Sequence, residues 1–138
     1  MTEKLLAPLR YLHTMVRVLD LKRTIGFYNL LGLEELRRSD VEGGRYTLVF
    51  MGFKEDPSKV EIELTFNWDR TEPYTIGDGF GHFAIAVPDV AAVAKKVHQE
   101  GAKFGGKVTR EPGPVKFGKT IIAFVEDPDG YKTELIEK

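Results

Sequence analysis

The chain repeats a short pattern, and this repeat constrains its fold more than any other feature of the sequence. His13 begins the segment His-Thr-Met-Val-Arg-Val-Leu-Asp-Leu, and His82 begins the segment His-Phe-Ala-Ile-Ala-Val-Pro-Asp-Val, 69 positions later. The segments that lead to Glu63 and Glu134 match each other at an offset of 71. Internal similarity of this kind indicates one supersecondary unit built twice. Each unit contributes one histidine and one glutamate.

Each copy is expected to fold in the order β-α-β-β-β. Alternation of apolar residues predicts a first strand over residues 11–18, and Asp20 and Gly32 are expected to begin and end the helix that follows. Asp89 and Gly101 take these places in the second copy. The other expected strands are 33–38, 45–51 and 60–67 in the first copy, and 81–87, 107–110, 120–125 and one ending at 136 in the second, with a turn at 127–130. The predicted modules are residues 10–69 and 79–138, joined by the polar segment 70–78.

A small sheet with one covering helix leaves a face that a single module cannot bury. The expected fold is therefore α+β, with two tandem βαβββ modules that form a cup-shaped mixed sheet. Alternate side chains of a strand point to opposite faces. His13 and Glu63 can therefore share the open face of one module, and His82 and Glu134 that of the other.

Composition restricts the kinds of chemistry and partner. The 138 residues include no cysteine, which removes disulfides, thiolate metal sites and thiol catalysis. A net charge of −1 with both signs spread along the chain gives no indication of a nucleic-acid or membrane surface. The apolar stretch Leu5–Leu9 is too short for a secretory signal or a membrane span. The lack of cysteine is compatible with a reducing cytosol, and a cytoplasmic location is expected.

Two imidazoles and two carboxylates on rigid strands suit a divalent metal ion. Nitrogen and oxygen donors without sulfur favour Ni, Co, Zn, Fe or Mn, with two positions left for water or substrate. Each histidine taken alone is more often a structural or surface residue than a ligand. Four such groups around one pseudo-twofold axis would leave unpaired buried charge unless a cation neutralised them. The repeat therefore favours His13, Glu63, His82 and Glu134 as ligands of one metal ion.

Four segments of the chain resemble glyoxalase I, a family of the vicinal oxygen chelate superfamily. They are residues 12–18, 62–68, 81–87 and 123–136, and the resemblance extends over residues 10–137. It implies isomerisation of the methylglyoxal–glutathione hemithioacetal to S-D-lactoylglutathione through an enediolate, with the metal ion as Lewis acid. It also implies that Glu134 is the base that moves the proton, with Glu63 as its symmetric partner.

The resemblance also suggests which residues contact glutathione. Arg17 and Asn67, four residues after the first histidine and the first glutamate, stand where the family places γ-glutamyl contacts. Residues four apart on a strand share a face, which makes both positions geometrically reasonable. Lys116 is the expected partner of the glycyl carboxylate, with Lys119 as an alternative.

One position departs from the family pattern. Some members have an arginine four residues before the second histidine, and Asp78 stands there in this chain. The second γ-glutamyl contact is then missing or is supplied by another residue, such as Arg110. The identity of the thiol cosubstrate stays open for this reason.

The assembly and the metal are likewise implied by resemblance. Small two-module members form twofold homodimers, in which His13 and Glu63 meet the partner's His82 and the partner's Glu134. A monomer that pairs its own modules would use the same four ligands. His13 in place of a glutamine, and the absence of long inserted loops, point to the bacterial class that prefers Ni²⁺ or Co²⁺, with Zn²⁺ possible.

Three other functions remain open. One is a different metalloenzyme on the same scaffold, such as an extradiol dioxygenase or an acyl-CoA epimerase, and another is a glyoxalase that uses a different thiol. The third is a metal-free resistance protein that sequesters a ligand in the cup. Glu63 as a fourth ligand counts against a dioxygenase, which uses two histidines and one carboxylate. The complete four-ligand set counts against a metal-free binder.

Overall fold

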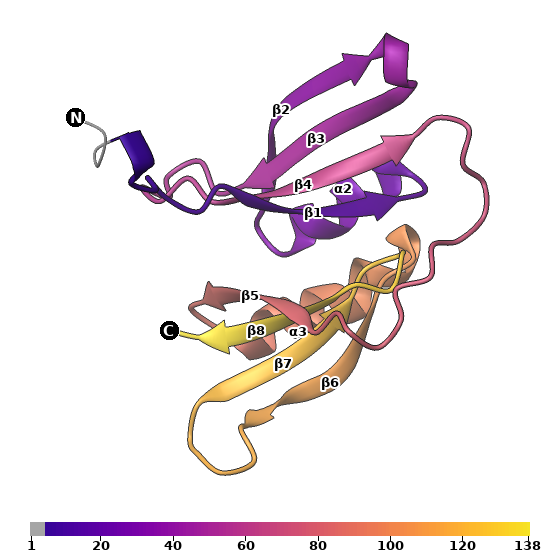
Figure 1. Cartoon of the computed structure of the whole chain (residues 1–138). Helices are drawn as coiled ribbons and strands as arrows, with labels where there is room; N and C mark the ends of the chain where they lie inside the picture. Colours follow the sequence, from indigo (N-terminus) through magenta and orange to yellow (C-terminus); the bar gives the residue numbers. More distant parts are fainter. Residues whose placement is uncertain (1–4) are drawn as a thin grey trace.

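The computed structural model describes residues 5–138 and contains two four-stranded mixed sheets, each with one packed helix (Figure 1). The first sheet has the order β1-β4-β3-β2 and the second the order β5-β8-β7-β6. The first module comprises β1 (His13–Val18), α2 (Leu21–Leu30), β2 (Glu34–Val41), the 3-10 turn η1 (Glu42–Gly44), β3 (Tyr46–Gly52) and β4 (Glu61–Asn67). The second comprises β5 (His82–Val87), α3 (Val90–Glu100), the 3-10 turn η2 (Gly101–Phe104), β6 (Lys107–Pro114), β7 (Ile121–Glu126) and β8 (Lys132–Glu137). The expected α+β class with two βαβββ modules is confirmed.

The two sheets share strand directions and register. β1 runs parallel to β4 and β5 runs parallel to β8, whereas the other neighbouring strands are antiparallel. The histidine-bearing strands β1 and β5 are edge strands in both cases. The outer strands are bulged at equivalent places, between Glu35 and Arg37 in β2 and between Val108 and Arg110 in β6. The repeat seen in the sequence therefore extends to the details of strand pairing.

The predicted aspartates begin both helices. The Asp20 carboxylate accepts a hydrogen bond of 3.0 Å from the Arg23 backbone N–H, and the Asp89 carboxylate accepts one of 2.9 Å from that of Ala92. Each bond satisfies an amide of the first helical turn that has no partner within the helix. The local sequence therefore fixes where each helix starts after its strand.

The observed ends of the helices and strands match the ends predicted from the sequence less closely. Gly32 ends α2 with a φ of +96°, as predicted. Gly101 follows α3 but keeps a helical φ of −60°, and the left-handed residue is Gly105, after a further 3-10 turn. A side chain at Gly101 would approach the Gly106 carbonyl oxygen to 3.1 Å, so close packing explains this glycine. Strand β6 extends to Pro114, beyond the predicted 107–110, because its bulge interrupts the alternation.

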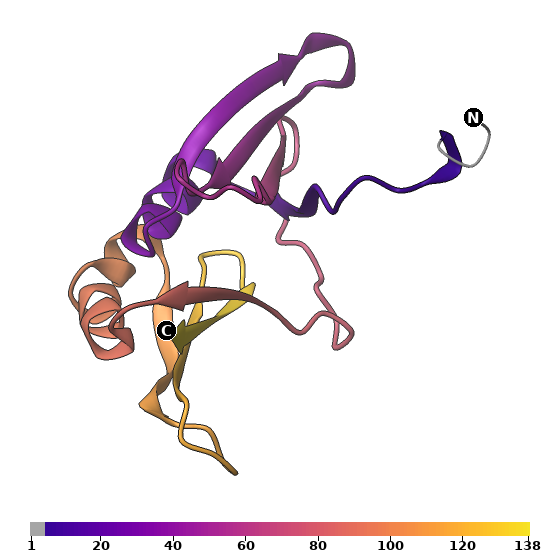
Figure 2. The same ribbon diagram turned by 90° about the vertical axis from the view of Figure 1, so that its left-hand side faces the viewer.

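The modules pack against each other through their helical sides (Figure 2). A Cβ at Gly106 would lie 2.2 Å from the Phe27 ring, and one at Gly26 would lie 2.4 Å from the Phe104 ring. These glycines therefore allow aromatic rings of one module to lie directly against the backbone of the other. The largest fully buried side chains come from both modules and include Tyr28, Phe27, Met51, Leu64 and Leu135.

The turn between β7 and β8 also joins the two modules. Its Asp127 carboxylate accepts a hydrogen bond of 2.6 Å from the Tyr28 hydroxyl of α2. Asp129 accepts hydrogen bonds from the Leu19 backbone N–H at 3.1 Å and from the Thr24 hydroxyl at 3.2 Å. These bonds link residues about 100 positions apart and hold the second module against the start of α2. Within residues 5–138, no helix has both the length and the apolar character needed to cross a bilayer.

Candidate active site

Each module holds one histidine–glutamate pair at the same point of its sheet. His13 on β1 and Glu63 on the adjacent β4 lie with Nε2 and Oε1 2.7 Å apart. His82 on β5 and Glu134 on β8 lie with Nε2 and Oε1 3.3 Å apart. In both modules the glutamate is two residues beyond the position directly opposite the histidine. The predicted sharing of one sheet face within each pair is therefore observed.

An aromatic ring lies against each imidazole. The Phe50 ring meets His13 edge-on, with centroids 5.5 Å apart and planes at 74°. The Phe124 ring meets His82 in the same way, at 5.1 Å and 75°. Sequence reasoning missed these two residues. Phe50 lies on β3 and Phe124 on β7, and each of these strands directly precedes the strand that bears the glutamate. An alignment of β3 with β7 as a further part of the repeat would have found both residues.

The two pairs do not come together within one chain. Among residues 5–138, no three or more His, Cys, Asp or Glu side chains lie close enough to hold one metal ion. The His13 and Glu63 side chains are 32% and 14% exposed, and those of His82 and Glu134 are 41% and 18% exposed. Each pair thus offers one nitrogen and one oxygen donor at an accessible point. This donor set fits a divalent ion that prefers nitrogen and oxygen, and a four-ligand site requires two half-sites to meet.

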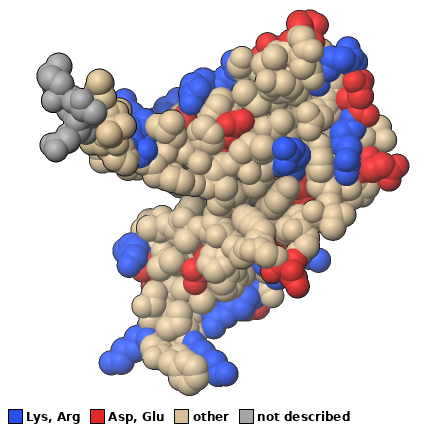
Figure 3. Space-filling model, in the orientation of Figure 1, with Lys and Arg blue, Asp and Glu red and all other residues tan. Residues whose placement is uncertain are grey.

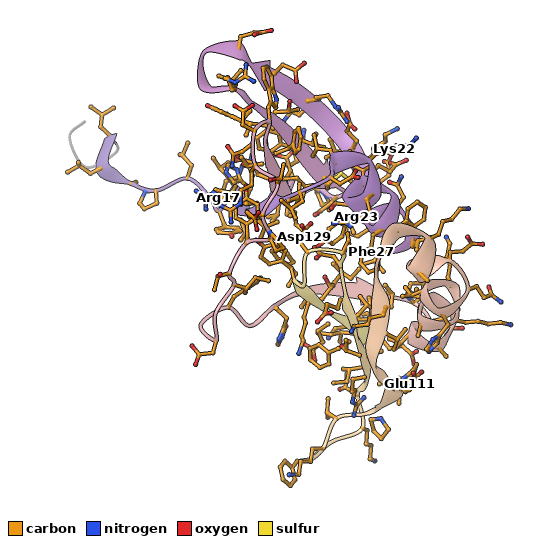
Figure 4. The ribbon with its side chains drawn as sticks, turned by 90° about the vertical axis from the view of Figure 1, so that its right-hand side faces the viewer. Arg17, Lys22, Arg23, Phe27, Glu111 and Asp129 are labelled. Carbon is orange, nitrogen blue, oxygen red and sulfur yellow. The ribbon has the colours of Figure 1, made fainter. Side chains whose placement is uncertain are left out.

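Arg17 and Asn67 lie near the ends of two neighbouring parallel strands of the first module, the edge strand β1 and the strand β4. The Tyr131 hydroxyl of the second module donates a hydrogen bond of 3.0 Å to the Arg17 backbone carbonyl. Burial raises the pKa of Tyr131, so the hydroxyl keeps the proton that this bond requires. The Asn67 Nδ2 donates to the Tyr74 hydroxyl at 3.0 Å. Figure 4 shows Arg17 projecting beside the junction of the modules.

The other predicted substrate contacts lie in loops. Lys116 and Lys119 belong to the exposed connection between β6 and β7, where the Lys116 ammonium lies 5.3 Å from the centre of the Phe117 ring. Asp78 is exposed in the segment that joins the modules. Arg110, in contrast, lies on β6 and lines a groove next to His82.

Two hollows lie beside the half-sites. A groove of about 520 Å³ in the second module is lined by residues that include His82, Arg110, Phe124, Tyr131 and Lys132. A cleft of about 460 Å³ between the modules has a mostly apolar lining, which includes Leu33, Met51, Ile62, Phe83 and Ile85. Figure 3 shows this cleft as the notch between the two lobes. None of the four candidate ligands lines the apolar cleft, whereas His82 lines the groove of the second module.

Residues 10–135 match the sequence model of the Glyoxalase/Bleomycin resistance protein/Dioxygenase superfamily. The chain belongs to this superfamily. The glyoxalase resemblance of its sequence motifs is thereby confirmed.

Relatives in the superfamily match nearly the whole chain. A probable lactoylglutathione lyase of Synechocystis sp. is 50% identical over 127 residues, which cover 91% of this chain and 93% of the relative. The lactoylglutathione lyase of Salmonella typhimurium is 51% identical over 130 residues, covering 94% and 93%.

Solved structures agree with this assignment. Glyoxalase I of Zea mays is 48% identical, with a TM-score of 0.85, over 94% of this chain and 44% of the maize chain. This chain therefore spans less than half the length of the maize protein. The trypanothione-dependent glyoxalase I of Leishmania major is 39% identical, with a TM-score of 0.79, over 94% of this chain and 87% of that chain.

Proposed function

We propose that the protein is a lactoylglutathione lyase, which isomerises the hemithioacetal of methylglyoxal and glutathione to S-D-lactoylglutathione. The main support is the pair of matching His–Glu half-sites in a chain about half identical to proteins of that name over nearly its full length. The proposal places the reaction in the cytoplasm, where thiols are kept reduced.

The proposal includes a twofold homodimer with an active site at each interface. The two half-sites of one chain lie apart, while buried hydrogen bonds and close-packed glycines fix its modules, residues 10–69 and 79–138, against each other. The histidine-bearing strands are sheet edges, and an apolar cleft adjoins them. A twofold axis would bring His13 and Glu63 to the partner's His82 and the partner's Glu134 in two equivalent sites.

These four side chains would hold the metal ion. Two imidazole nitrogens and two carboxylate oxygens fit Ni²⁺ or Co²⁺, and Zn²⁺ is an alternative. When bound, the divalent cation supplies Lewis-acid polarisation of the substrate oxygens. The aromatic rings beside both imidazoles restrict the orientation of the histidines.

Glu134 is the proposed base. Its carboxylate removes the proton from the carbon that bears the thiol sulfur and returns it to the neighbouring carbon, which converts the hydroxyketone to the thioester. The side chain is only 18% exposed, which limits proton exchange with water during the transfer. Glu63 is the symmetric partner and has the same relation to its own histidine.

Arg17, Asn67 and Lys116 are the proposed contacts of the glutathione part. Arg17 and Asn67 would bind the γ-glutamyl group, and Lys116 the glycyl carboxylate. The hydrogen bond from Tyr131 holds the Arg17 backbone, which supports a fixed position for its side chain. Asn67 would exchange its bond with Tyr74 for one to the substrate.

The test is thioester formation from methylglyoxal and glutathione by chelator-treated protein refilled separately with Ni²⁺, Co²⁺ and Zn²⁺. We expect activity with nickel and cobalt and little with zinc, together with a dimer in light scattering. Metal content would be measured on the same samples. Absence of activity with every metal would overturn the glutathione assignment.

A further inference from the structure

The two half-sites differ in the residue that lies two positions beyond the glutamate. Thr65 follows Glu63 on β4, whereas Ile136 follows Glu134 on β8. Each of the two stands opposite the residue that lies four positions beyond the histidine of its module. Alternate residues of a strand share a face, so each side chain lies on the same side of its sheet as the glutamate. One half-site therefore has a hydroxyl group beside its glutamate, and the other has an aliphatic side chain.

The Thr65 hydroxyl contacts the glutamate of its half-site directly. Thr65 is only 8% exposed, and its hydroxyl donates a hydrogen bond of 3.3 Å to Glu63 Oε2. This is longer than the common O–H···O distance of about 2.7 Å, as hydrogen bonds in active sites without substrate often are. The other oxygen of the same carboxylate, Oε1, lies 2.7 Å from His13 Nε2. Each oxygen of Glu63 therefore has its own partner, and turning the carboxylate away would break both contacts.

The Glu134 carboxylate is held by fewer contacts. Its Oε1 lies 3.3 Å from His82 Nε2, and within residues 5–138 no other cationic side chain forms an ion pair with it. Ile136 has no hydrogen-bonding group in its side chain, so no bond equivalent to that of Thr65 can form here. The Glu134 side chain can therefore turn and return without breaking a second contact.

The surroundings of the first histidine add to this difference. The Arg37 guanidinium carbon lies 3.6 Å from the centre of the Phe50 ring, which contacts the His13 imidazole. Arg37 is itself held by Glu61, with Nη2 and Oε1 2.8 Å apart. In the part of the chain that the structure describes, no cation lies over the ring of Phe124 in this way. The first half-site is thus fixed at its histidine as well as at its glutamate.

We propose that Thr65 is a positioning residue that holds the Glu63 carboxylate in place as a metal ligand and thereby leaves the proton transfer to Glu134. The inference rests on the proposed function, in which both glutamates are metal ligands and one of them is also the base. A base must come within hydrogen-bond reach of the proton that it removes. Glu63 would have to give up the Thr65 bond to turn toward the substrate, whereas Glu134 gives up no such bond. One hydroxyl group would therefore assign different tasks to two equivalent glutamates.

The first test measures nickel binding, which does not depend on turnover. Thr65→Val removes the hydroxyl and nearly keeps the shape of the side chain, and Thr65→Ser keeps the hydroxyl. Loss of a hydrogen bond to a ligating carboxylate should weaken nickel binding by the metal-free dimer about tenfold in competition with a chelator. Thr65→Ser should stay within about twofold of the wild type, with melting curves to verify that both variants fold. An unchanged nickel affinity of Thr65→Val would overturn the proposal.

The second test asks whether Glu63, once released, can replace the missing base. When Thr65→Val is added to Glu134→Gln, the residual kcat should rise about threefold to tenfold, the equivalent of one hydrogen bond. Thr65→Ser should give no rise, because its hydroxyl still holds Glu63. The measurement is kcat at saturating hemithioacetal, with every dimer fully loaded with nickel. A residual kcat that does not rise would overturn the proposal, and so would an effect on KM alone, which would make Thr65 a substrate contact.

The reciprocal experiment moves the hydroxyl to the other half-site. Ile136→Thr places it beside Glu134 and should lower kcat about threefold to tenfold while nickel binding becomes tighter. Ile136→Val shortens the side chain without adding a hydroxyl, so it is the matched control and should change neither quantity by more than about twofold. Equal kcat values for these two variants would contradict the assignment.

The outcomes separate this inference from the proposed function. If the wild type forms the thioester, but Thr65→Val changes neither the nickel affinity nor the residual kcat, the role of Thr65 is wrong and the proposed function stands. If the wild type forms no thioester with any metal, the proposed function is overturned. Weaker nickel binding by Thr65→Val would in that case still support Thr65 as the residue that positions Glu63, and unchanged binding would overturn both.

Discussion

Two inactive variants should restore activity when they share a dimer. His13→Ala removes a donor from the first module, and His82→Ala removes one from the second, so every site of either homodimer has three donors. In a mixed dimer, one site joins the two altered modules and the other joins the two unaltered ones. The second site has all four donors. This outcome follows directly from the separation of the two half-sites within one chain.

The size of the recovery follows from the pairing statistics. Random association of equal amounts of two chains makes about half of the dimers mixed, and half of the sites in those dimers are intact. The mixture should therefore reach about one quarter of the wild-type activity. The unmixed variants should remain far lower, because each of their sites lacks a metal ligand.

The assay is thioester formation after the two variants are unfolded together in urea, refolded and loaded with nickel. Separate refolding followed by mixing without exchange serves as the control. The converse control mixes wild type with the variant that has both substitutions, and exchange should then lower the activity by about half. An exchanged mixture no more active than its components would refute the interface site and favour a chain that pairs its own modules.

Four further results are expected. Glu134→Gln should lower kcat by about 100-fold or more while the nickel content stays measurable, since it removes the base and leaves an oxygen donor. Burial raises the pKa of Asp127 from 3.8 to about 6. The native carboxyl thus binds its proton more tightly than the unfolded one, so the free energy of unfolding falls by about 3 kcal/mol as pH rises from about 4 to about 6. Asp127→Asn should remove this fall in the free energy of unfolding, which is measured by urea titrations at a series of pH values. Tyr131→Phe should raise KM more than it lowers kcat, because the hydroxyl holds the Arg17 carbonyl. Gly106→Ala would place a Cβ 2.2 Å from an aromatic ring of α2, and the overpacking should cost about 1–3 kcal/mol in thermal unfolding.

The features that the sequence predicts correctly are local or repeated. The positions of Asp20 and Asp89 predict both helix starts, because capping depends only on amides within the next three residues. The alternation of side chains predicts that His13 and Glu63 share a face, and the repeat extends this to the second module. The roles of these residues as ligands and base are still predictions.

The features that the sequence did not predict depend on contacts between distant residues. A one-residue bulge reverses the faces of the side chains that follow it, so simple alternation places Arg37 and Arg110 wrongly. The turn that contains Asp127 and Asp129 looks like an ordinary Asp-Pro-Asp-Gly turn. Its bonds to Tyr28 and Leu19 depend on how the two modules pack, which no local pattern encodes.

A site built from two similar halves must also bind its substrate in one orientation. The histidine, the glutamate and the phenylalanine are the same in both halves, so these residues cannot distinguish one end of the substrate from the other. The differences lie in charged groups: Arg17 corresponds to Ala86 in the repeat, and Glu61 corresponds to Lys132 in the register. Coulomb interactions with the carboxylates of the thiol would therefore select the orientation, and with it the glutamate that faces the proton to be moved. On this reasoning, reversing the charge at Lys132 should impair acidic substrates first, whereas loss of Glu134 should impair every substrate alike.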